Sequence, residues 1–239
     1  ALTKAGKILY ETMSVIRNDE EIMIKRMQEK QSTIELVLGV TLTAGEYALA
    51  KPLSVFLNKH PEMNMHIIYG NAEQLLAKLD NGEIHFALIE GYFPSHKYEQ
   101  LLYYTDSFIC VCAKNHTFSK KVNHIEDLLN ERILIRETGS GTRDLLDSYL
   151  KTYNLSYLDF KNHLEIESIS SIISLLKNDC GISFLYRLSV EEELKNGSLK
   201  EIKIQNLQLH HDTTFLWNKN SVYSKQYNEI CKELIGEFN

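Results

Sequence analysis

Residues 132–150 read RILIRETGSGTRDLLDSYL and contain the pattern that decides the fold. A strand is predicted at 132–136, where three consecutive aliphatic residues occur. Apolar side chains then recur at the spacing of one helical face, at Leu145, Leu146, Tyr149 and Leu150. Between the two, Gly139 and Gly141 flank Ser140, and glycine lets a backbone approach a bound group closely. The stretch predicts a strand, a candidate binding turn and a helix.

The same alternation extends outward from this unit in both directions. Short apolar runs typical of strands occupy residues 35–40, 65–69, 85–89, 107–113, 181–185 and 213–217. Helical patterns lie between them, with apolar faces at residues 49–57, 75–79 and 169–176. Strands that alternate with helices of roughly 10 to 15 residues are typical of βαβ units and parallel sheets. The sequence therefore predicts the α/β fold class.

Residues 2–31 are predicted to form one long helix that precedes this body. Apolar residues recur every seven positions at Leu2, Leu9, Ile16 and Met23, and a second row follows Ile8, Val15 and Ile22. Such a seam on an otherwise charged helix favours pairing with another helix. An amphipathic helix that packs on its own domain has the same stripe, so both interpretations stay open.

The composition is that of a globular protein. Of 239 residues, 44% are hydrophobic and 24% charged, which excludes disordered and disulfide-scaffold classes. No apolar run approaches the roughly 20 residues of a membrane span, and no secretory signal is expected at the N-terminus. The net charge is −6, with +1 in residues 1–32 and −7 in the rest. Domains that bind phosphate backbones have a basic face, so DNA contact would need residues from elsewhere.

Metal and thiol chemistry receive little support. The four cysteines form no CxxC pair and are predicted to be reduced thiols of a cytoplasmic protein: Cys110, Cys112, Cys180 and Cys231. His210, His211 and Asp212 are the only dense group of metal-ligating residues. Adjacent residues of a strand point to opposite faces, so this group is a poor chelate. No metal and no cofactor are predicted.

Three strand-to-helix junctions, at residues 41–45, 137–143 and 165–170, offer hydroxyl groups at helix starts. Open α/β sheets bind ligands beyond the carboxyl ends of their strands. The free N–H groups and positive dipole end of a helix suit a carboxylate, sulfate or phosphate. Ser and Thr at helix starts are also ordinary N-caps, so each junction has a purely structural interpretation as well.

No catalytic motif accompanies these junctions. The sequence lacks the phosphate loop GxxxxGK[ST], the dinucleotide fingerprint GxGxxG, the nucleophile elbow GxSxG and the zinc motif HExxH. Glu90, Glu137 and Glu167 are isolated acids, and no spacing marks an acid–base pair among them. The sequence favours binding over catalysis, and no enzyme activity is predicted.

Several segments, in order, resemble LysR-type transcriptional regulators. Residues 1–9 (ALTKAGKIL) are similar to the L-T-x-A-G-x-x-L tract that leads from the winged helix-turn-helix of that family into its linker helix. Residues 71–89 resemble the family's next helix and G-E-L-D-x-x-I strand, and residues 137–143 (ETGSGTR) its G-S-G-T-R variant. Residues 181–185 (GISFL) resemble its G-x-G-I-x-x-L strand, although Asp179 stands where Gly is frequent. Each motif alone is weak, but together they extend over essentially the whole chain.

The resemblance implies two Rossmann-like subdomains of the type II periplasmic-binding-protein fold, preceded by a long linker helix. It implies the end of a winged helix-turn-helix and a dimerisation helix at 1–32, subdomain I at 33–113 plus 212–239, and subdomain II at 114–211. A small anionic effector would be held in the cleft between the subdomains. The residues that match the family's effector positions are Thr41, Thr43, Thr138, Gly139, Ser140, Gly141, Thr142, Arg143 and Ser168. For Arg143, both an anion contact and a local salt bridge remain open.

For the whole regulator, the resemblance implies a cytoplasmic homodimer or homotetramer that binds DNA through a winged helix-turn-helix preceding Ala1, with no membrane association. Two alternatives share the fold: a solute-binding protein of a transport system, and a transferase with an acid–base pair in the cleft. The long N-terminal helix favours the regulator over the solute-binding protein.

Overall fold

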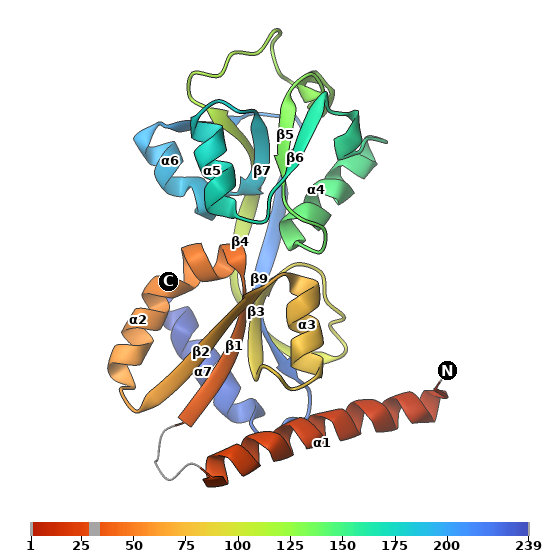
Figure 1. Cartoon of the computed structure of the whole chain (residues 1–239), viewed down its shortest axis with the longest axis vertical. Coiled ribbons are helices and arrows are strands. Elements are labelled where there is room, and N and C mark those ends of the chain that lie inside the picture. The colour runs from red at the N-terminus through yellow and green to blue at the C-terminus, as the bar shows by residue number, and fades with distance from the viewer. Residues whose placement is uncertain (1, 29–33, 239) are drawn as a thin grey trace. The chain divides into compact units, whose positions relative to one another are not determined.

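The computed structural model describes residues 2–28 and 34–238, which fold into two compact units (Figure 1). Unit 1 consists of two separate stretches of chain, Ala1–Tyr104 and Thr213–Asn239, whereas unit 2 is the continuous stretch Thr105–Asp212. The boundaries fall inside two strands, β4 (Tyr98–Ala113) and β9 (Leu209–Asn218), so each of these strands contributes residues to both units.

Unit 1 contains a mixed sheet with the strand order β2-β1-β3-β9. β1 is parallel to β2 and to β3, and β9 is antiparallel to β3. The strands are β1 (Ile34–Thr41), β2 (Met63–Gly70), β3 (Phe86–Glu90) and the unit 1 parts of β9 and β4. All five residues of β3 are buried, as expected for a central strand with both faces covered.

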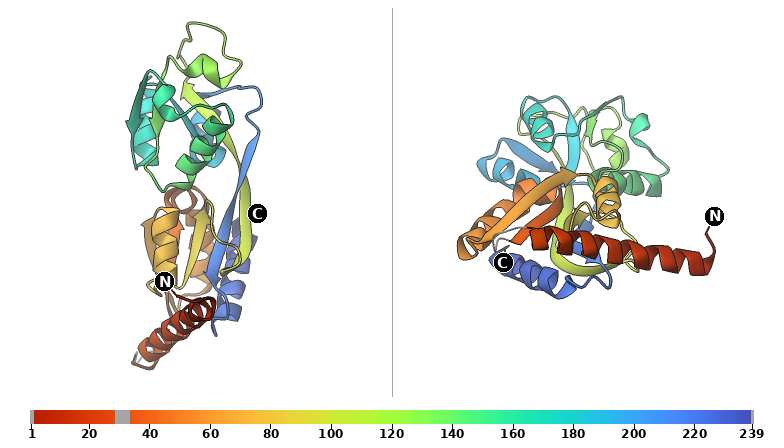
Figure 2. Two further views of the ribbon diagram at one scale, coloured as in Figure 1. Left: turned by 90° about the vertical axis from the view of Figure 1, so that its right-hand side faces the viewer. Right: turned by 60° about the horizontal axis from the view of Figure 1, so that its bottom comes forward.

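Helices cover both faces of the unit 1 sheet (Figure 2). They are α3 (Ala72–Asp80), α7 (Ser224–Phe238), and a π-helical segment (Ala44–Leu49) that continues into α2 (Ala50–Lys59). Leu75 of α3 belongs to the same buried cluster as Ala87 of β3. Phe86, the preceding strand residue, faces α7, where its ring lies 5.6 Å from that of Tyr227. Successive side chains of a strand point to opposite faces of the sheet, so β3 packs against α3 on one face and α7 on the other.

Unit 2 has the strand order β4-β7-β5-β6, and β8 pairs with β4. β5 is parallel to β6 and to β7, and β4 is antiparallel to β7. The further strands are β5 (Arg132–Ile135), β6 (Asn162–Glu165), β7 (Ile182–Tyr186) and β8 (Leu199–Ile202). The helices are α4 (Gly141–Thr152), α5 (Ile169–Lys177) and α6 (Glu191–Asn196), with 3-10 turns at Ile125–Leu128, Tyr157–Asp159 and Arg187–Val190.

α1 (Lys4–Gln28) is fixed to unit 1 near its C-terminal half (Figures 1 and 2). Asp19 accepts hydrogen bonds from Ser221 Oγ at 2.7 Å and from the N–H of Val222 at 2.8 Å. Asn18 is buried against Gly82, where a Cβ would lie 2.2 Å from Asn18 Oδ1. Gly82 also has φ = +72°, a conformation that glycine adopts readily. α1 is thus attached to the turn before β3 and to the turn after β9.

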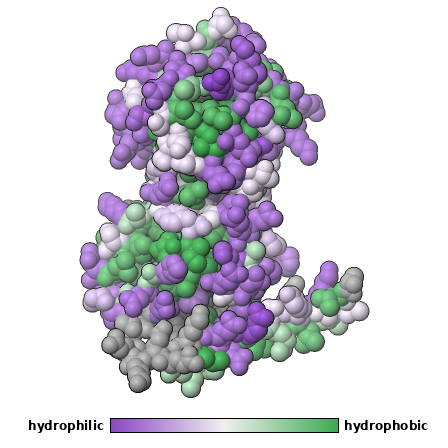
Figure 3. Space-filling view, viewed as in Figure 1, coloured by the Kyte–Doolittle hydropathy of each residue, from purple (hydrophilic) through white to green (hydrophobic). Residues whose placement is uncertain are grey.

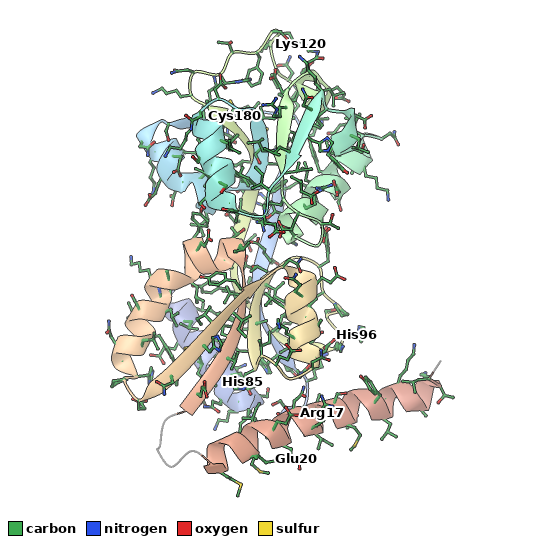
Figure 4. All side chains as sticks on the ribbon, in the orientation of Figure 1. Arg17, Glu20, His85, His96, Lys120 and Cys180 are labelled. Carbon is green, nitrogen blue, oxygen red and sulfur yellow. The ribbon has the colours of Figure 1, made fainter. Side chains whose placement is uncertain are left out.

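Other parts of α1 present apolar side chains at the surface (Figure 3). Leu9 is 64% exposed and Ile16 52%, whereas Ile22 is 7% exposed. The charged residues Arg17 and Glu20 beside the attachment point are also exposed (Figure 4). The predicted seam therefore packs on its own unit near Ile22 and leaves an apolar row uncovered elsewhere. Residues 29–31 of the predicted helix lie outside the described residues.

The predicted α/β fold class is confirmed, and each predicted strand overlaps an observed one. β6 and β8 were not predicted. All four residues of β6 are exposed, and in β8 two charged residues separate the buried Leu199 and Ile202, so no apolar run marks either strand. Within the described ranges, the structure contains no helix with the length and apolar character that crossing a membrane requires.

Candidate functional site

Each unit contains one topological switch point, where successive connections leave a strand in opposite directions. In unit 1 the chain passes from β1 to β2 on one side and then to β3 on the other side of β1. In unit 2 it passes from β5 to β6 and then to β7 on the other side of β5. Ligands of open α/β sheets bind at such points, beyond the carboxyl ends of the strands. We name them switch point 1 (Thr41, Thr43 and Glu90) and switch point 2 (residues 136–142 and Tyr186).

Switch point 1 gathers buried polar groups at the ends of β1 and β3. Thr41 is the last residue of β1, and its Oγ1 accepts a hydrogen bond from the N–H of Glu90 at 3.4 Å. Glu90 is the last residue of β3, and its exposed fraction is only 3%. It is paired with Thr213 of β9, and directly opposed residues of antiparallel strands have neighbouring side chains on one face. An acid and two hydroxyls therefore meet here.

Thr43 is the most informative residue of switch point 1. It is 1% exposed and already helical, with φ = −60° and ψ = −49°, and it makes no side-chain capping hydrogen bond. Its Oγ1 is buried without a hydrogen-bond partner. A buried hydroxyl without a partner costs about 1 to 3 kcal/mol. The N-cap interpretation therefore does not explain Thr43.

The helix that follows Thr43 begins with the π-helical segment Ala44–Leu49. π-Helical segments are rare in proteins, and those that occur are often found at functional sites. A Cβ on Gly45 would lie 2.4 Å from Cε1 of Tyr69, the penultimate residue of β2. Glycine is therefore required here for the aromatic ring to rest against the helix backbone.

Switch point 2 contains the start of α4. Ser140 occupies the N-cap position and is buried, yet its side chain makes no capping hydrogen bond. Gly139 before it has φ = +86°, which favours glycine. Gly141 and Thr142 are buried in the first helical turn, whereas Thr138 is exposed. The first N–H groups of a helix have no partner within the helix, so this turn is suited to bind an anion.

Arg143 is engaged within unit 2. Its Nε lies 2.8 Å from Asp147 Oδ2, and its Nη1 donates to the carbonyl oxygen of Arg136 at 2.9 Å. Nη1 also lies 3.4 Å from Glu165 Oε2, and the guanidinium stacks 4.1 Å from the ring centroid of Tyr157. Of the two interpretations of this residue, the structure shows the local salt bridge, and the anion contact stays a prediction.

Arg136 is likewise neutralised by a neighbour. Its Nε and Nη2 donate to the two carboxylate oxygens of Glu137 at 2.8 and 2.9 Å. Such bidentate pairs are strong and geometrically specific. Glu137, which the sequence presents as an isolated acid, is therefore the ion-pair partner of a buried arginine.

Ser168 differs from Ser140 although both begin helices of unit 2. Its Oγ accepts a hydrogen bond from the N–H of Ser171 at 3.2 Å and lies 3.0 Å from Ser170 Oγ. It follows β6, the terminal strand in the order given above, and not a strand at the switch point. Ser168 is an ordinary N-cap in this structure, and its effector contact stays a prediction.

Two residues of the switch points, Glu90 and Tyr186, are not among the predicted effector-binding residues. Glu90 was considered only as a catalytic acid, although an acid directly after the apolar run FALI gives the same signal as Thr41 after β1. Tyr186, at the end of β7, donates or accepts a hydrogen bond with His211 Nδ1 at 2.7 Å. Burial lowers the pKa of His211, which favours the neutral ring. Residues 186 and 211 are far apart in the sequence, so no local pattern indicates that they meet.

The described residues contain no group of three or more His, Cys, Asp or Glu side chains suited to hold a metal ion. The four cysteines are free, and burial raises the pKa of the Cys110 and Cys231 thiols. Thiolates, not thiols, are the reactive species, so burial makes these two cysteines unreactive.

Residues 29–238 match the family model of the LysR substrate binding domain. A probable RuBisCO transcriptional regulator of Gracilaria tenuistipitata var. liui is 25% identical over 243 residues, which cover 99% of this chain and 79% of the relative. A protein with the same description from Trichormus variabilis is 24% identical, with 99% and 72% covered.

Two solved structures share the fold. The Synechocystis PCC6803 CcmR regulatory domain, in complex with 2-PG, superposes with a TM-score of 0.73 at 20% identity, covering 86% of this chain and 97% of that one. The effector binding domain of QuiR, in complex with shikimate, gives 0.71 at 18% identity, with 87% and 98% covered. The periplasmic-binding-protein-like α/β architecture, the alternation around two switch points and the match over residues 29–238 agree: the chain belongs to the LysR substrate-binding domain family of transcriptional regulators.

Proposed function

We propose that this chain senses a small anionic metabolite through switch points 1 and 2 and thereby controls a DNA-binding regulator. The observation that supports the proposal most directly is Thr43, whose buried hydroxyl has no hydrogen-bond partner beside a helix start. A ligand atom that accepts a hydrogen bond from Thr43 would remove the cost of that buried group.

Switch point 2 supplies the anion-binding part of this proposal. The backbone N–H groups that begin α4 and the hydroxyls of Ser140 and Thr142 suit a carboxylate or phosphate. Among similar proteins, CcmR was solved with 2-PG and QuiR with shikimate. Both compounds were found in domains of this fold, which makes small acids the first class to test here.

α1 supports the oligomeric part of the proposal. The exposed row that includes Leu9 and Ile16 recurs every seven residues, and apolar residues at that interval pair helices. We propose that α1 pairs with α1 of a second copy in a homodimer or homotetramer. DNA contact would then be made by a winged helix-turn-helix outside these 239 residues, in a cytoplasmic regulator that is not an enzyme.

Calorimetric titration tests the sensing proposal. The 239-residue chain is titrated with sulfate, phosphate, 2-phosphoglycolate, shikimate and simple carboxylates at one ionic strength. We expect at least one to bind, and Ser140→Ala and Thr142→Ala each to weaken binding by about tenfold, the effect of one hydrogen bond of about 1.4 kcal/mol.

Thr152→Ala is the matched control, because Thr152 lies at the other end of α4 and donates to the carbonyl of Tyr149. It should leave the affinity unchanged. Absence of binding by every anion would contradict the proposal. So would binding that Ser140→Ala and Thr142→Ala leave intact.

A further inference from the structure

We infer that unit 1 contains a further binding site, a pocket beside α1 that takes a monocarboxylic acid with an apolar body. The pocket has a volume of about 520 Å³, within the range of roughly 300 to 1,000 Å³ that is typical of small-molecule sites. It shares no residue with switch points 1 and 2, so the inference goes beyond the proposed function and does not depend on it. We name it the α1 pocket, and its lining includes Ile8, Thr12, Val15, Asp80, Lys97 and Lys219.

One wall of the α1 pocket is formed by the same face of α1 that is attached to unit 1. Ile8, Thr12 and Val15 line the pocket, and the same spacing of three or four residues leads on to Asp19, which bonds the turn after β9. Side chains at this spacing are neighbours on one side of a helix. Ile22, one turn beyond Asp19, is 7% exposed, whereas Ile8 is 59% exposed. The attached face of α1 therefore continues as an apolar strip that borders the pocket.

The opposite wall comes from the end of α3, the segment before β4 and the turn after β9. His96 marks the segment before β4 on the side of unit 1 that faces α1 (Figure 4). Asp80 is the one acidic residue of the lining within the described chain, and its carboxylate already has partners. Tyr98 Oη donates to Asp80 Oδ1 at 2.8 Å, and Lys97 Nζ forms an ion pair with Oδ2. The negative charge at this wall is therefore neutralised.

Lys219 brings a positive charge to the same wall. Its Nζ donates to the carbonyl oxygens of His96 at 2.8 Å and of Ser95 at 3.4 Å. An ammonium group has three donors, so these two bonds leave room for a third acceptor. Both acceptors are neutral, and no carboxylate among residues 2–28 and 34–238 forms an ion pair with Lys219. The α1 pocket thus combines an apolar strip with a cation whose charge is uncompensated within the described chain.

These features select the chemical class of the ligand. One uncompensated ammonium group suits one carboxylate, with which it can form a charge-assisted hydrogen bond. The strip that contains Ile8 and Val15 suits an apolar chain or ring, because removal of apolar surface from water is favourable in proportion to its area. A medium-chain or aromatic monocarboxylic acid has both parts.

A ligand in the α1 pocket would contact α1 and the rest of unit 1 at the same time. A ligand that binds only the attached arrangement of α1 stabilises that arrangement increasingly as its concentration rises. The pocket would thereby connect the level of an apolar acid to the position of α1, whose other apolar row, at Leu9 and Ile16, is proposed to pair two copies.

Calorimetric titration of the 239-residue chain with octanoate, butanoate and octylammonium tests the site. Octanoate has both the carboxylate and the long apolar chain. Butanoate keeps the carboxylate on a shorter chain, and octylammonium keeps the chain with the opposite charge. We expect octanoate to bind at least about tenfold more tightly than either of the others, because each of them lacks one of the two contacts.

Lys219→Met tests the charged contact, because it removes the ammonium group and keeps most of the apolar stem. It should weaken octanoate binding by about tenfold, the effect of one charge-assisted hydrogen bond. Lys225→Met is the matched control, since the Lys225 side chain is 91% exposed on α7. It should leave the affinity for octanoate unchanged.

Val15→Ser tests the apolar wall and should weaken octanoate binding by about fivefold or more, because less apolar surface is buried. Leu9→Ser is its matched control on the same helix. Leu9 is 64% exposed and lies outside the pocket lining in the described chain. Its replacement should leave the affinity unchanged, whatever it does to the pairing of copies.

Absence of octanoate binding would overturn the inference, as would octylammonium binding as tight as that of octanoate. An octanoate affinity that neither Lys219→Met nor Val15→Ser lowers would overturn it as well, and either variant suffices if the other does not fold. A tenfold loss of octanoate affinity in Ser140→Ala would place the acid at switch point 2. That result would remove the α1 pocket as a site and would support the proposed function.

Discussion

Switch points 1 and 2 arise from the same topology but differ in how far their polar groups are already engaged. At switch point 2, Arg136 is held by Glu137, and Arg143, the residue that follows switch point 2 in the sequence, is held by Asp147 and Tyr157. At switch point 1, the Thr43 hydroxyl is buried without a hydrogen-bond partner. A charged residue beside a helix start is thus not necessarily a ligand contact. A buried polar side chain that already has hydrogen-bond partners is explained by the structure of its own unit. A buried polar side chain without a partner is the better candidate for a ligand contact.

The strongest test of this difference is Arg143→Ala. Removing the guanidinium loses the ring contact with Tyr157, the bond to the Arg136 carbonyl and two carboxylate contacts. Because Asp147 and Glu165 are about half exposed, solvent screens them after the substitution, and we expect a loss of about 2 kcal/mol in the free energy of unfolding.

Urea denaturation measures this change. Lys195→Ala, which removes an exposed pair with Glu191, is the control and should change stability by less than about 0.5 kcal/mol. A loss for Arg143→Ala as small as that of the control would mean that the arginine is free to bind a ligand.

Thr41→Val and Thr43→Val separate two hydroxyls of switch point 1. Thr41→Val removes the acceptor of the buried Glu90 N–H and should cost about 1 to 2 kcal/mol. Thr43→Val removes a hydroxyl that has no hydrogen-bond partner, so stability should stay constant or rise by up to about 1 kcal/mol.

Thermal and urea unfolding of the two variants give the comparison directly. Anion affinity should fall in Thr43→Val despite its unchanged stability. A Thr43→Val variant that loses as much stability as Thr41→Val would show that the hydroxyl has a structural role.

The smallest expected effect concerns the two serines that begin helices in unit 2. Ser168→Ala should cost about 0.5 to 1 kcal/mol, because the side chain caps the N–H of Ser171. Ser140→Ala should lower the free energy of unfolding by only a few tenths of the loss expected for Ser168→Ala, since no capping hydrogen bond is lost. Equal losses in urea denaturation would remove the distinction between cap and binding group.

The sequence predicted the elements that have a strong local pattern. β3 and α4 were identified from an apolar run and from an apolar helical face: β3 lies within one residue of the predicted 85–89, and α4 contains the predicted face from Leu145 to Leu150. β6 was not predicted, because its side chains are exposed and form no apolar run. The junction residues Thr41, Thr43 and Ser140 could be named because hydroxyls after strands are visible in any sequence.

The sequence could not predict which hydrogen-bond and ion-pair partners the polar side chains have. Arg143 meets Glu165 across 22 residues, and Glu90 meets Thr41 across 49. Such contacts depend on strand order, which no local pattern encodes. The domain boundaries at 113/114 and 211/212 also remain a prediction, beside compact units that divide at 104/105 and 212/213.

The discontinuity of unit 1 has a consequence for synthesis on the ribosome. Unit 2 is complete when residue 212 has emerged, but unit 1 still lacks the partner of β3 and the helix that covers Phe86. Domains generally fold as units during translation, so the later unit in the sequence should fold first and the earlier one should wait. A premature stop within the last 27 residues, 213–239, would therefore damage the half of the protein to which the first helix is attached, and leave the other half with its own core.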